Sequence, residues 1–547
     1  PNFDYSMAPG VVKTFRKQYF IHLGDYFSAA LGLNLEDARL LAKAIQKSLP
    51  ADIRFSTAAS YKLRLMEFLP AHQARGGYQP ISAEAAGAAH DFAVKAATES
   101  TDRATYQAME AFIHNLNTMN SRAGAQVPFS SVNYGTDTSP EARMVIRNLL
   151  QATRAGLGGG ETPIFPVQIF KVKEGVNYNP GDPNYDLFQL AIETSAKRLF
   201  PNFSFLDAPF NKQYYRPNDY NSEVAYMACR ARVMGNVHDP SREVTCGRGN
   251  LSFTSVNLPR LALEAKGDLE KFYAGLDEMT ELVIRQLYHR FKIQCAKRCR
   301  NYPFLMGQGV WIDSETLEPG DSIAELLKHG TLTMGFIGLA ECLKALIGKH
   351  HGESPEAQKL GLQIIGRMRR HMDEESARTG LNFTLIATPA EGLSGRFVRI
   401  DRQRYGNLKG ITDRDYYTNS FHIPVYYPIA AAKKIALEAP YHALTNAGHI
   451  SYVEMDGDPT KNLKAFEAII RCMHDHGIGY GSVNHPVDRD PVCGYNGLID
   501  NVCSFFFRFA DEFLGLFAGF LRIDLRNVHL PLCFFKSGLF CVFDNFV

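Results

Sequence analysis

Residues 226–260 read YMACRARVMGNVHDPSREVTCGRGNLSFTSVNLPR, and the rest of the chain is organised around this stretch. A lone cysteine, Cys229, follows a short apolar run. A turn rich in glycine and arginine then leads to Asn250 and to a strand that ends in Asn-Leu-Pro-Arg. Few purely structural segments need this combination, so we predict that Cys229 is the reactive group of the protein.

The composition indicates the class of protein and excludes some kinds of partner. The chain has 547 residues, of which 45% are hydrophobic and 21% charged, as is typical of a globular protein with a large core. A net charge of +2 is too balanced to indicate binding to a membrane or to a nucleic acid polymer. Ten scattered cysteines exclude a disulfide framework and favour a reducing cytoplasm. Because the chain opens at Pro1 without an initiator Met, we expect that its start has been cut.

Short apolar runs alternate with helical patterns along the chain, which predicts an α/β fold built from parallel βαβ units. Residues 10–125 are expected to be mainly helical, with Asn34 as the cap of one helix and a new helix opening after Thr101-Asp102. Further helices are expected at 140–156, 186–199, 267–299, 354–379 and 428–438. Strands are expected at 164–172, 304–311, 383–387, 422–427 and 449–454, and a strand running into a helix at 331–340.

Two segments offer groups that suit a ligand. Residues 117–131 form either a plain helix-to-strand connection or a polar loop that lines a pocket, with Ser121 and Arg122 as candidate substrate contacts. In Thr388-Pro389-Ala390-Glu391, a proline follows a threonine where a helix is expected to begin. The free amides of a helix N-terminus bind phosphate or sulfate, although a plain helix cap is the commoner role of such a sequence.

The remaining cysteines and histidines give weaker signals. Cys493 and Cys503 resemble the start of a zinc knuckle, but each lacks the partner of a C-x₂-C pair. Cys295 and Cys299 are expected to be half-buried thiols on one helix, and Cys246 a packing residue. A metal site could also be suggested by His350, His351, Glu353, His474 and His476, but no HExxH pattern is present, so we expect these histidines to be solvated in loops or helices.

The central stretch closely resembles the class III, anaerobic ribonucleoside-triphosphate reductases, which are glycyl radical enzymes. The same resemblance covers about residues 1–503 in a series of blocks in one order. These blocks are NTMNSRAGAQVPFSS, GLGGGETPIFPVQIFK, NYPFLMGQGVW, HGTLTMGFIGLAE, LIATPAEGLSGRF, YYTNSFHIPV, GHISYVEMDGD and NHPVDRDPVCGYNG.

The resemblance implies a ten-stranded α/β barrel of two five-stranded halves, with Cys229 at the tip of a finger loop inside it. In this family a glycyl radical oxidises the cysteine to a thiyl radical, which takes the 3′ hydrogen atom of the ribose. Asn250 matches an active-site asparagine, and Met227 matches the subtype that uses formate as reductant. Thr388, Pro389, Ala390 and Glu391 look like the phosphate-binding helix start.

The resemblance also implies partners: ribonucleoside triphosphates, ATP and dNTP effectors, a radical-SAM iron-sulfur activating enzyme, and a second copy of the chain in a homodimer. It implies a catalytic barrel over 1–480 and the start of a zinc-binding region over 481–503. Residues 504–547 hold 12 of the 37 phenylalanines and look like translation in a shifted frame. They carry no Arg-x-x-Gly-Tyr segment for the glycyl radical, so we expect the chain alone to be inactive.

Two alternatives remain open. The first is a catalytically incomplete remnant that still binds nucleotides. The second is another glycyl radical enzyme, related to pyruvate formate-lyase. Those enzymes usually carry two adjacent cysteines in the finger loop, and Ala228 beside Cys229 argues against this alternative.

Overall fold

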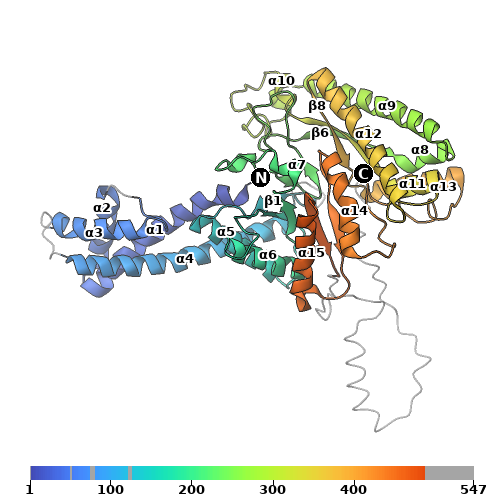
Figure 1. Ribbon diagram of the computed structural model, residues 1–547. Helices are drawn as coiled ribbons and strands as arrows, with labels where there is room; N and C mark the ends of the chain where they lie inside the picture. The colour runs from blue at the N-terminus through green and yellow to red at the C-terminus, as the bar shows by residue number, and fades with distance from the viewer. Residues whose placement is uncertain (1, 50–51, 74–80, 121–125, 487–547) are drawn as a thin grey trace, which may run out of the picture. The chain divides into compact units, whose positions relative to one another are not determined.

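The computed structural model describes residues 2–49, 52–73, 81–120 and 126–486 (Figure 1). The chain divides into two compact units, one from Asn2 to Thr194 and one from Ser195 onward. Each unit has its own core. Among the described residues, no helix is long and apolar enough to cross a membrane.

The first unit is largely helical, as expected for residues 10–125. Figure 1 shows α1 (Phe3–Leu31) and α4 (Ala83–Thr118) running side by side. The other elements of this unit are α2 (Leu35–Ser48), α3 (Ala58–Gln73), β1 (Ser131–Tyr134), α5 (Pro140–Ala155), β2 (Val167–Val172) and α6 (Tyr185–Arg198), and β1 pairs with β2 in parallel.

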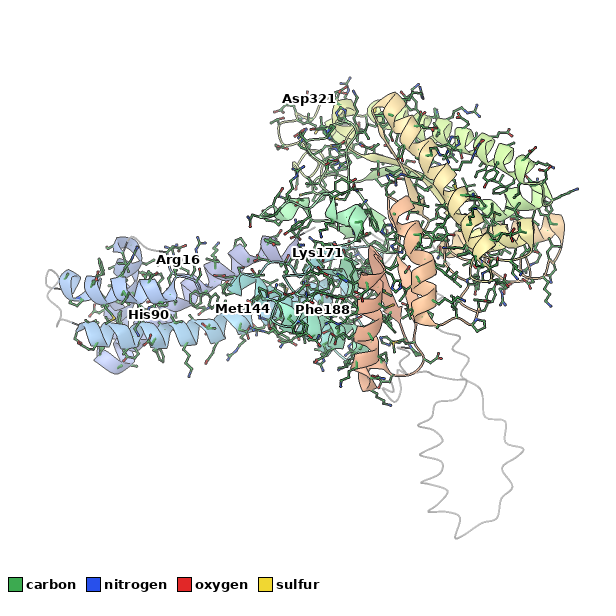
Figure 2. The ribbon with its side chains drawn as sticks, viewed as in Figure 1. Arg16, His90, Met144, Lys171, Phe188 and Asp321 are labelled. Carbon is green, nitrogen blue, oxygen red and sulfur yellow. The ribbon has the colours of Figure 1, made fainter. Side chains whose placement is uncertain are left out.

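Local sequence explains the helix ends of this unit. The side chain of Asn34 accepts a hydrogen bond from the Asp37 amide at the start of α2, which confirms the expected cap. The expected break at Thr101-Asp102 is wrong, because α4 continues unbroken through these residues. Thr101 is fully buried, and its carbonyl accepts the hydroxyl of Thr105 one turn later. Inside the bundle, the hydroxyl of Tyr19 lies 2.9 Å from Nδ1 of His90, which is labelled in Figure 2.

The second unit contains the expected parallel βαβ pattern. Strands β6 (Asn250–Asn257), β7 (Thr331–Ile337) and β8 (Asn382–Ala387) pair in parallel in that order. Their apolar side chains share one core with α8 (Leu258–Ala265), α9 (Leu269–Cys295), α11 (Leu339–Ile347) and α12 (Pro355–Thr379). Figure 1 shows α9 and α12 lying against this sheet.

A second group of strands lies in the same unit. Strand β10 (Tyr480–Asn484) pairs in parallel with β9 (Ser451–Glu454) and antiparallel with β3 (Asn202–Phe205). The remaining helices include α7 (Pro209–Lys212), α10 (Ala324–Leu327), α13 (Glu391–Tyr405), α14 (Ala431–Leu444) and α15 (Leu463–Asp475). The architecture is α/β as expected, and the strand pairings of the described residues do not by themselves establish a ten-stranded barrel.

Two expected strands are absent from the described structure. Residues 304–311 form successive turns, closed by bonds such as that from the Trp311 amide to the Leu305 carbonyl at 2.9 Å. Gly309 adopts a left-handed φ of 66° there, which suits a turn rather than a strand. Residues 422–427 are also irregular, because the Ile423 amide donates to the Glu438 carboxylate rather than to a neighbouring strand.

Candidate active site

Cys229 lies at the tip of a short β-hairpin. Strand β4 (Tyr226–Met227) pairs antiparallel with β5 (Ala231–Arg232), and residues 228–230 connect them. Ala228 has a φ of 50°, a left-handed conformation that turns the chain sharply before the cysteine. Cys229 itself is half-buried. The hairpin therefore presents one thiol at a fixed bend.

The base of this hairpin is attached to residues 447–449. The Arg232 amide donates to the Ala447 carbonyl at 2.6 Å, and the His449 amide donates to the Arg230 carbonyl at 3.1 Å. Gly448 bridges in turn to Ile386 on β8. A Cβ atom at Gly448 would lie 2.0 Å from the Arg230 carbonyl oxygen, so only glycine permits this approach. The cysteine-bearing hairpin is thereby joined to the end of the three-stranded sheet.

Buried aromatic and imidazole rings support the hairpin from within. The hydroxyl of Tyr226 lies 2.8 Å from Nε2 of His449, and the Tyr226 ring stacks on Tyr480 with centroids 4.6 Å apart. The hydroxyl of Tyr480 donates to the Ala228 carbonyl at 3.2 Å, directly before the cysteine. The ring of His442 lies 4.2 Å from that of His449. These contacts fix the backbone on both sides of Cys229.

Burial keeps two histidines and the thiol of the hairpin neutral. It lowers the pKa of His442 to about 3 and that of His449 well below its usual value. Burial also raises the pKa of the Cys229 thiol; the Arg230 guanidinium opposes this increase, and the Glu391 carboxylate adds to it. Cys229 is thus held as a neutral thiol, which suits hydrogen-atom transfer and not the thiolate chemistry of a nucleophile.

The segment Thr388–Glu391 lies near the hairpin tip. Nη1 of Arg230 donates to the Thr388 carbonyl at 3.1 Å, and the charge of Glu391 acts on the Cys229 thiol. The expected helix start is two residues too early, because α13 begins at Glu391 and no side chain caps it. The Thr388 side chain is fully buried and its hydroxyl lies 2.8 Å from that of Ser255.

Asn250 occupies the first position of β6 and is exposed. Its amide nitrogen donates to the hydroxyl of Thr331 at 3.0 Å and also to that of Thr333, which leaves the amide oxygen to accept from a ligand. The sheet register aligns Asn250 with Thr331 and Asn382, whereas Ala387 lies five residues further along β8, roughly 16 Å at strand spacing. The structure therefore brings Met227, Cys229 and Thr388–Glu391 together and places Asn250 toward the opposite end of the sheet.

The structure does not describe all of the expected site residues. Ser121, Arg122, Cys493 and Cys503 lie outside the described residues. Within the described ranges, no group of three or more His, Cys, Asp or Glu side chains could hold a metal ion.

Three expectations about individual side chains are wrong. His350 and His351 are buried rather than solvated, and burial lowers the pKa of His351 to about 4. Nε2 of His351 lies 2.7 Å from the Phe421 carbonyl oxygen, so this ring has a structural contact. Cys246 is exposed rather than packed. Helix α9 ends at Cys295, so Cys299 does not share a helix with it.

The sequence reasoning missed the groups that hold the hairpin, namely Arg230, Tyr226, His442, His449 and Tyr480. Arg230, Tyr226 and His449 lie in stretches that the sequence singles out, and their position beside Cys229 or in GHISYVEMDGD was the available signal. No local pattern marks His442 or Tyr480, because their role depends on contacts made over long sequence distances.

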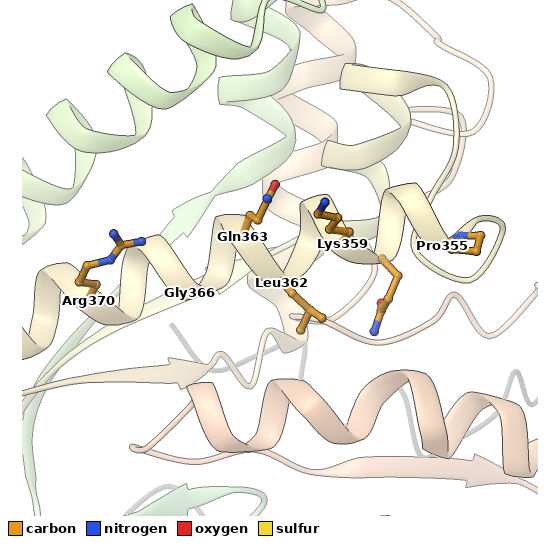
Figure 3. A pocket seen from close by; sticks show the side chains of 7 residues that line it. Pro355, Lys359, Leu362, Gln363, Gly366 and Arg370 are labelled. Carbon is orange, nitrogen blue, oxygen red and sulfur yellow. The ribbon is translucent and has the colours of Figure 1, made fainter.

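A shallow groove lies away from the cysteine, on α12. Figure 3 shows side chains following one another along this helix, among them Lys359, Leu362, Gln363 and Arg370. Since none of the site residues described above lines it, the groove is not the candidate active site.

Comparison with solved structures defines the class of fold. The chain superposes on an anaerobic ribonucleotide reductase with a TM-score of 0.54 at 15% identity, covering 90% of this chain and 82% of that one. The Thermotoga maritima anaerobic ribonucleotide reductase in complex with dATP and CTP gives a TM-score of 0.54 at 14% identity, with coverages of 90% and 86%. A structure described for 1,2-propanediol dehydration in Roseburia inulinivorans gives 0.52 at 11% identity, with coverages of 93% and 70%. These similarities show a fold shared by anaerobic ribonucleotide reductases and a dehydrating enzyme.

Sequence comparison narrows this class to one family. The family described as anaerobic ribonucleoside-triphosphate reductase matches residues 1–505. A protein of that name from Enterobacteria phage T4 is 35% identical over 75% of this chain and 67% of its own length. The chain belongs to the anaerobic ribonucleoside-triphosphate reductase family. The proteins of that name from Salmonella typhimurium and Escherichia coli are 35% and 34% identical over 73% of this chain, and in each case the match spans 55% of the relative's length.

Proposed function

We propose that the chain carries the catalytic thiol of an enzyme that reduces ribonucleoside triphosphates to 2′-deoxyribonucleoside triphosphates. The observation that supports this most strongly is the Cys229 hairpin, in which a neutral, half-buried thiol is held at a fixed bend. Hydrogen-atom abstraction needs a sulfur held against one C–H bond, and rigid positioning of this kind contributes about 7–11 kcal/mol to lowering a barrier.

In the proposed mechanism, Cys229 in its thiyl form takes the 3′ hydrogen atom of the ribose. The 2′ hydroxyl then leaves as water, and a reductant supplies the electrons that complete the deoxyribose. Cys229 would receive its oxidising equivalent from a glycyl radical, which would take the hydrogen atom of the thiol. The half-buried position of Cys229 fits this role, because a thiyl must be kept from water and oxygen.

The other site residues have proposed roles in binding. The free amides at the start of α13, from Glu391 onward, bind phosphate; Pro389 shapes this turn without an N–H to donate, and the Ala390 amide already donates to Asn419. The Thr388 backbone links the turn to the hairpin through Arg230. The free amide oxygen of Asn250 accepts a hydrogen bond from a ribose hydroxyl, which would require the substrate or the sheet end to approach the hairpin. Ser121 and Arg122 contribute substrate contacts from the 117–131 loop.

Further features of the proposal come from the family resemblance. Formate is the reductant, in line with Met227, and Cys493 and Cys503 would be ligands of an incomplete zinc site. The chain works in the cytoplasm as a homodimer that is regulated by ATP and dNTP effectors and charged by a radical-SAM activating enzyme. Residues 1–480 contribute a ten-stranded catalytic barrel, residues 481–503 begin the zinc region, and residues 504–547 are a frame-shifted tail.

The test is an anaerobic assay of the chain with the activating enzyme, formate and a glycyl-radical segment supplied as a separate polypeptide. We expect conversion of labelled CTP to dCTP, and complete loss of conversion in Cys229→Ser, whereas Cys246→Ser retains it. Binding of CTP by Cys229→Ser should persist. Turnover by Cys229→Ser would refute the assignment of Cys229, and CTP binding without any turnover by the unmodified chain would favour the nucleotide-binding remnant.

A further inference from the structure

Three arginines of the central stretch are almost fully buried: Arg230, Arg232 and Arg248 are 4%, 2% and 6% exposed. A buried guanidinium is costly unless its N–H groups are hydrogen-bonded and its charge is balanced. The three residues therefore allow a comparison within one segment. They differ in whether the chain supplies a hydrogen-bond partner for every guanidinium nitrogen.

In Arg232 and in Arg248, each of the three guanidinium nitrogens has a hydrogen-bond partner within the protein. Nε, Nη1 and Nη2 of Arg232 donate to the Asn211 side chain, the Asn446 carbonyl and the Phe210 carbonyl at 3.0, 3.1 and 2.7 Å. The same three nitrogens of Arg248 donate to the carbonyls of His329, Val244 and Gly235 at 2.8, 3.1 and 2.8 Å. Both side chains tie loops together, and neither offers a donor nitrogen to a ligand.

Arg230 differs from both. Its Nη1 donates to the Thr388 carbonyl at 3.1 Å and lies 3.5 Å from that of Ala387, but its Nε is buried without a hydrogen-bond partner. None of the ion pairs formed by the described residues includes it. The hydroxyl of Tyr452 also interacts with it, and its charge acts on Cys229 and His422. The chain thus buries a positive charge beside Cys229 and leaves part of its donor edge unused.

The Arg230 guanidinium lies beside a helix start that favours negative charge. Arg230 follows Cys229 directly and reaches the carbonyls that precede α13. The start of that helix carries a partial positive charge and free amides. Glu391 is the nearby carboxylate that acts on Cys229, but it is exposed and forms no ion pair with Arg230 within the described ranges. A small oxyanion bound between Arg230 and the α13 start would satisfy the guanidinium.

We propose that Arg230 is an anion-binding residue of the active site, which holds one oxyanion, a carboxylate or a phosphate group, next to Cys229. The planar edge of a guanidinium binds two oxygens of either group. This inference rests on the proposed function, in which two oxyanions enter the site: the formate that serves as reductant and the phosphates of the nucleotide. Their shared chemistry is a delocalised negative charge on adjacent oxygens.

The test compares Arg230→Gln with Arg248→Gln in the full chain under anaerobic conditions. Thermal melting is measured with sodium formate, with inorganic tripolyphosphate and with sodium chloride at equal ionic strength. We expect one of the two oxyanions to stabilise the unmodified chain beyond chloride, and Arg230→Gln to bind that anion at least tenfold more weakly. Arg248→Gln should melt earlier without ligand but respond to the anion as the unmodified chain does.

The outcomes separate the possibilities. A response to formate alone identifies the carboxylate as the bound group, and a response to tripolyphosphate alone identifies the phosphate. Equal responses of the unmodified chain and Arg230→Gln, or no response beyond chloride in either, would overturn the inference. If Arg230→Gln does not fold, Arg230→Lys keeps the charge without the planar edge and should still bind more weakly. CTP turnover by the unmodified chain is measured separately, so the proposed function stands or fails independently.

Discussion

Two cysteine-bearing turns of the central stretch differ in how they present their thiols. Cys229, at the tip of the β4–β5 hairpin, is half-buried, and burial raises its pKa. Cys246 is exposed in the turn that precedes Asn250. Both turns are firmly attached: residues 447–449 hold the first, and Arg248 holds the second through three carbonyls. Rigidity is therefore common to both, and enclosure of the sulfur is what distinguishes the candidate reactive thiol.

The enclosure of Cys229 depends on segments that are distant in sequence. Gly448 lets the hairpin approach β8, and the Tyr226, Tyr480 and His449 rings fill the space behind it. The Cys246 turn instead rests on the backbone of the loop around Gly235 and His329. Changes at the hairpin supports should therefore affect the first turn and leave the second intact.

The largest effect is expected for Gly448→Ala. Its Cβ would lie 2.0 Å from the Arg230 carbonyl oxygen, and relieving such a clash by moving backbone should lower the free energy of unfolding by about 3 kcal/mol. Gly457→Ala is the matched control. Gly457 also has a positive φ, 75°, but has open space around it, so it should lose about 1 kcal/mol through backbone strain alone. Equal losses in denaturant titrations of the two variants would show that the hairpin does not depend on this close approach.

The next effect concerns acid pH. Burial lowers the pKa of His442 to about 3; Glu438 opposes this decrease, and His422 and Lys434 add to it. Between that value and about 6.5 the unfolded chain binds a proton that the folded chain does not, so stability is greatest above pH 6.5 and falls as the pH decreases. From pH 7 to pH 5 the free energy of unfolding should fall by about 2 kcal/mol through His442 alone.

This pH prediction is checked by denaturant titrations at the two pH values. His442→Gln cannot be protonated and should lose about 2 kcal/mol less than the unmodified chain over this interval. The same dependence in both proteins would mean that His442 is protonated in the folded state, and that the rings behind the hairpin are more accessible to water than their burial indicates.

Local signals predicted much of the fold around these turns. Ser354 and Pro355 start α12, and the strand-to-helix run at 331–340 became β7 and α11. These elements follow from apolar periodicity and from caps that act within a few residues. In contrast, residues 304–311 and 422–427 are apolar but irregular, because their backbone groups bond within turns or to the buried Glu438 side chain.

The sequence predicted the central residues of the candidate site but not the residues that support them. Cys229 and the stretch 388–391 carry recognisable sequence, and the structure brings them together through Arg230. The partners of Arg230 and the stacking of Tyr226 on Tyr480 depend on where distant segments meet, which periodicity does not reveal. The burial of His350 and His351 escaped prediction for the same reason, since a histidine pair in a short polar segment looks solvated in isolation.

A smaller effect is expected in thiol reactivity. Alkylation requires the thiolate, and each unit by which a pKa rises lowers the thiolate fraction about tenfold near neutral pH. Because burial raises the pKa of Cys229 and also limits access to it, Cys229 should react with iodoacetamide more slowly than the exposed Cys246. Mass spectrometry of the two peptides over time measures both rates in one sample. Comparable rates would remove the distinction between the two turns.

The smallest effect is expected for Tyr226→Phe, which removes the hydroxyl 2.8 Å from Nε2 of His449 but keeps the ring that stacks on Tyr480. The buried imidazole then loses one partner, while its Nδ1 keeps its contacts with Thr445. The free energy of unfolding should fall by about 1 kcal/mol, the cost of one unsatisfied buried group. Tyr288→Phe, on α9, removes a hydroxyl with no hydrogen bond within the described ranges and should change stability little. If Tyr226→Phe also leaves the free energy of unfolding unchanged, the hairpin is held by ring packing and backbone hydrogen bonds alone. The polar contact between Tyr226 and His449 then contributes nothing to enclosing Cys229.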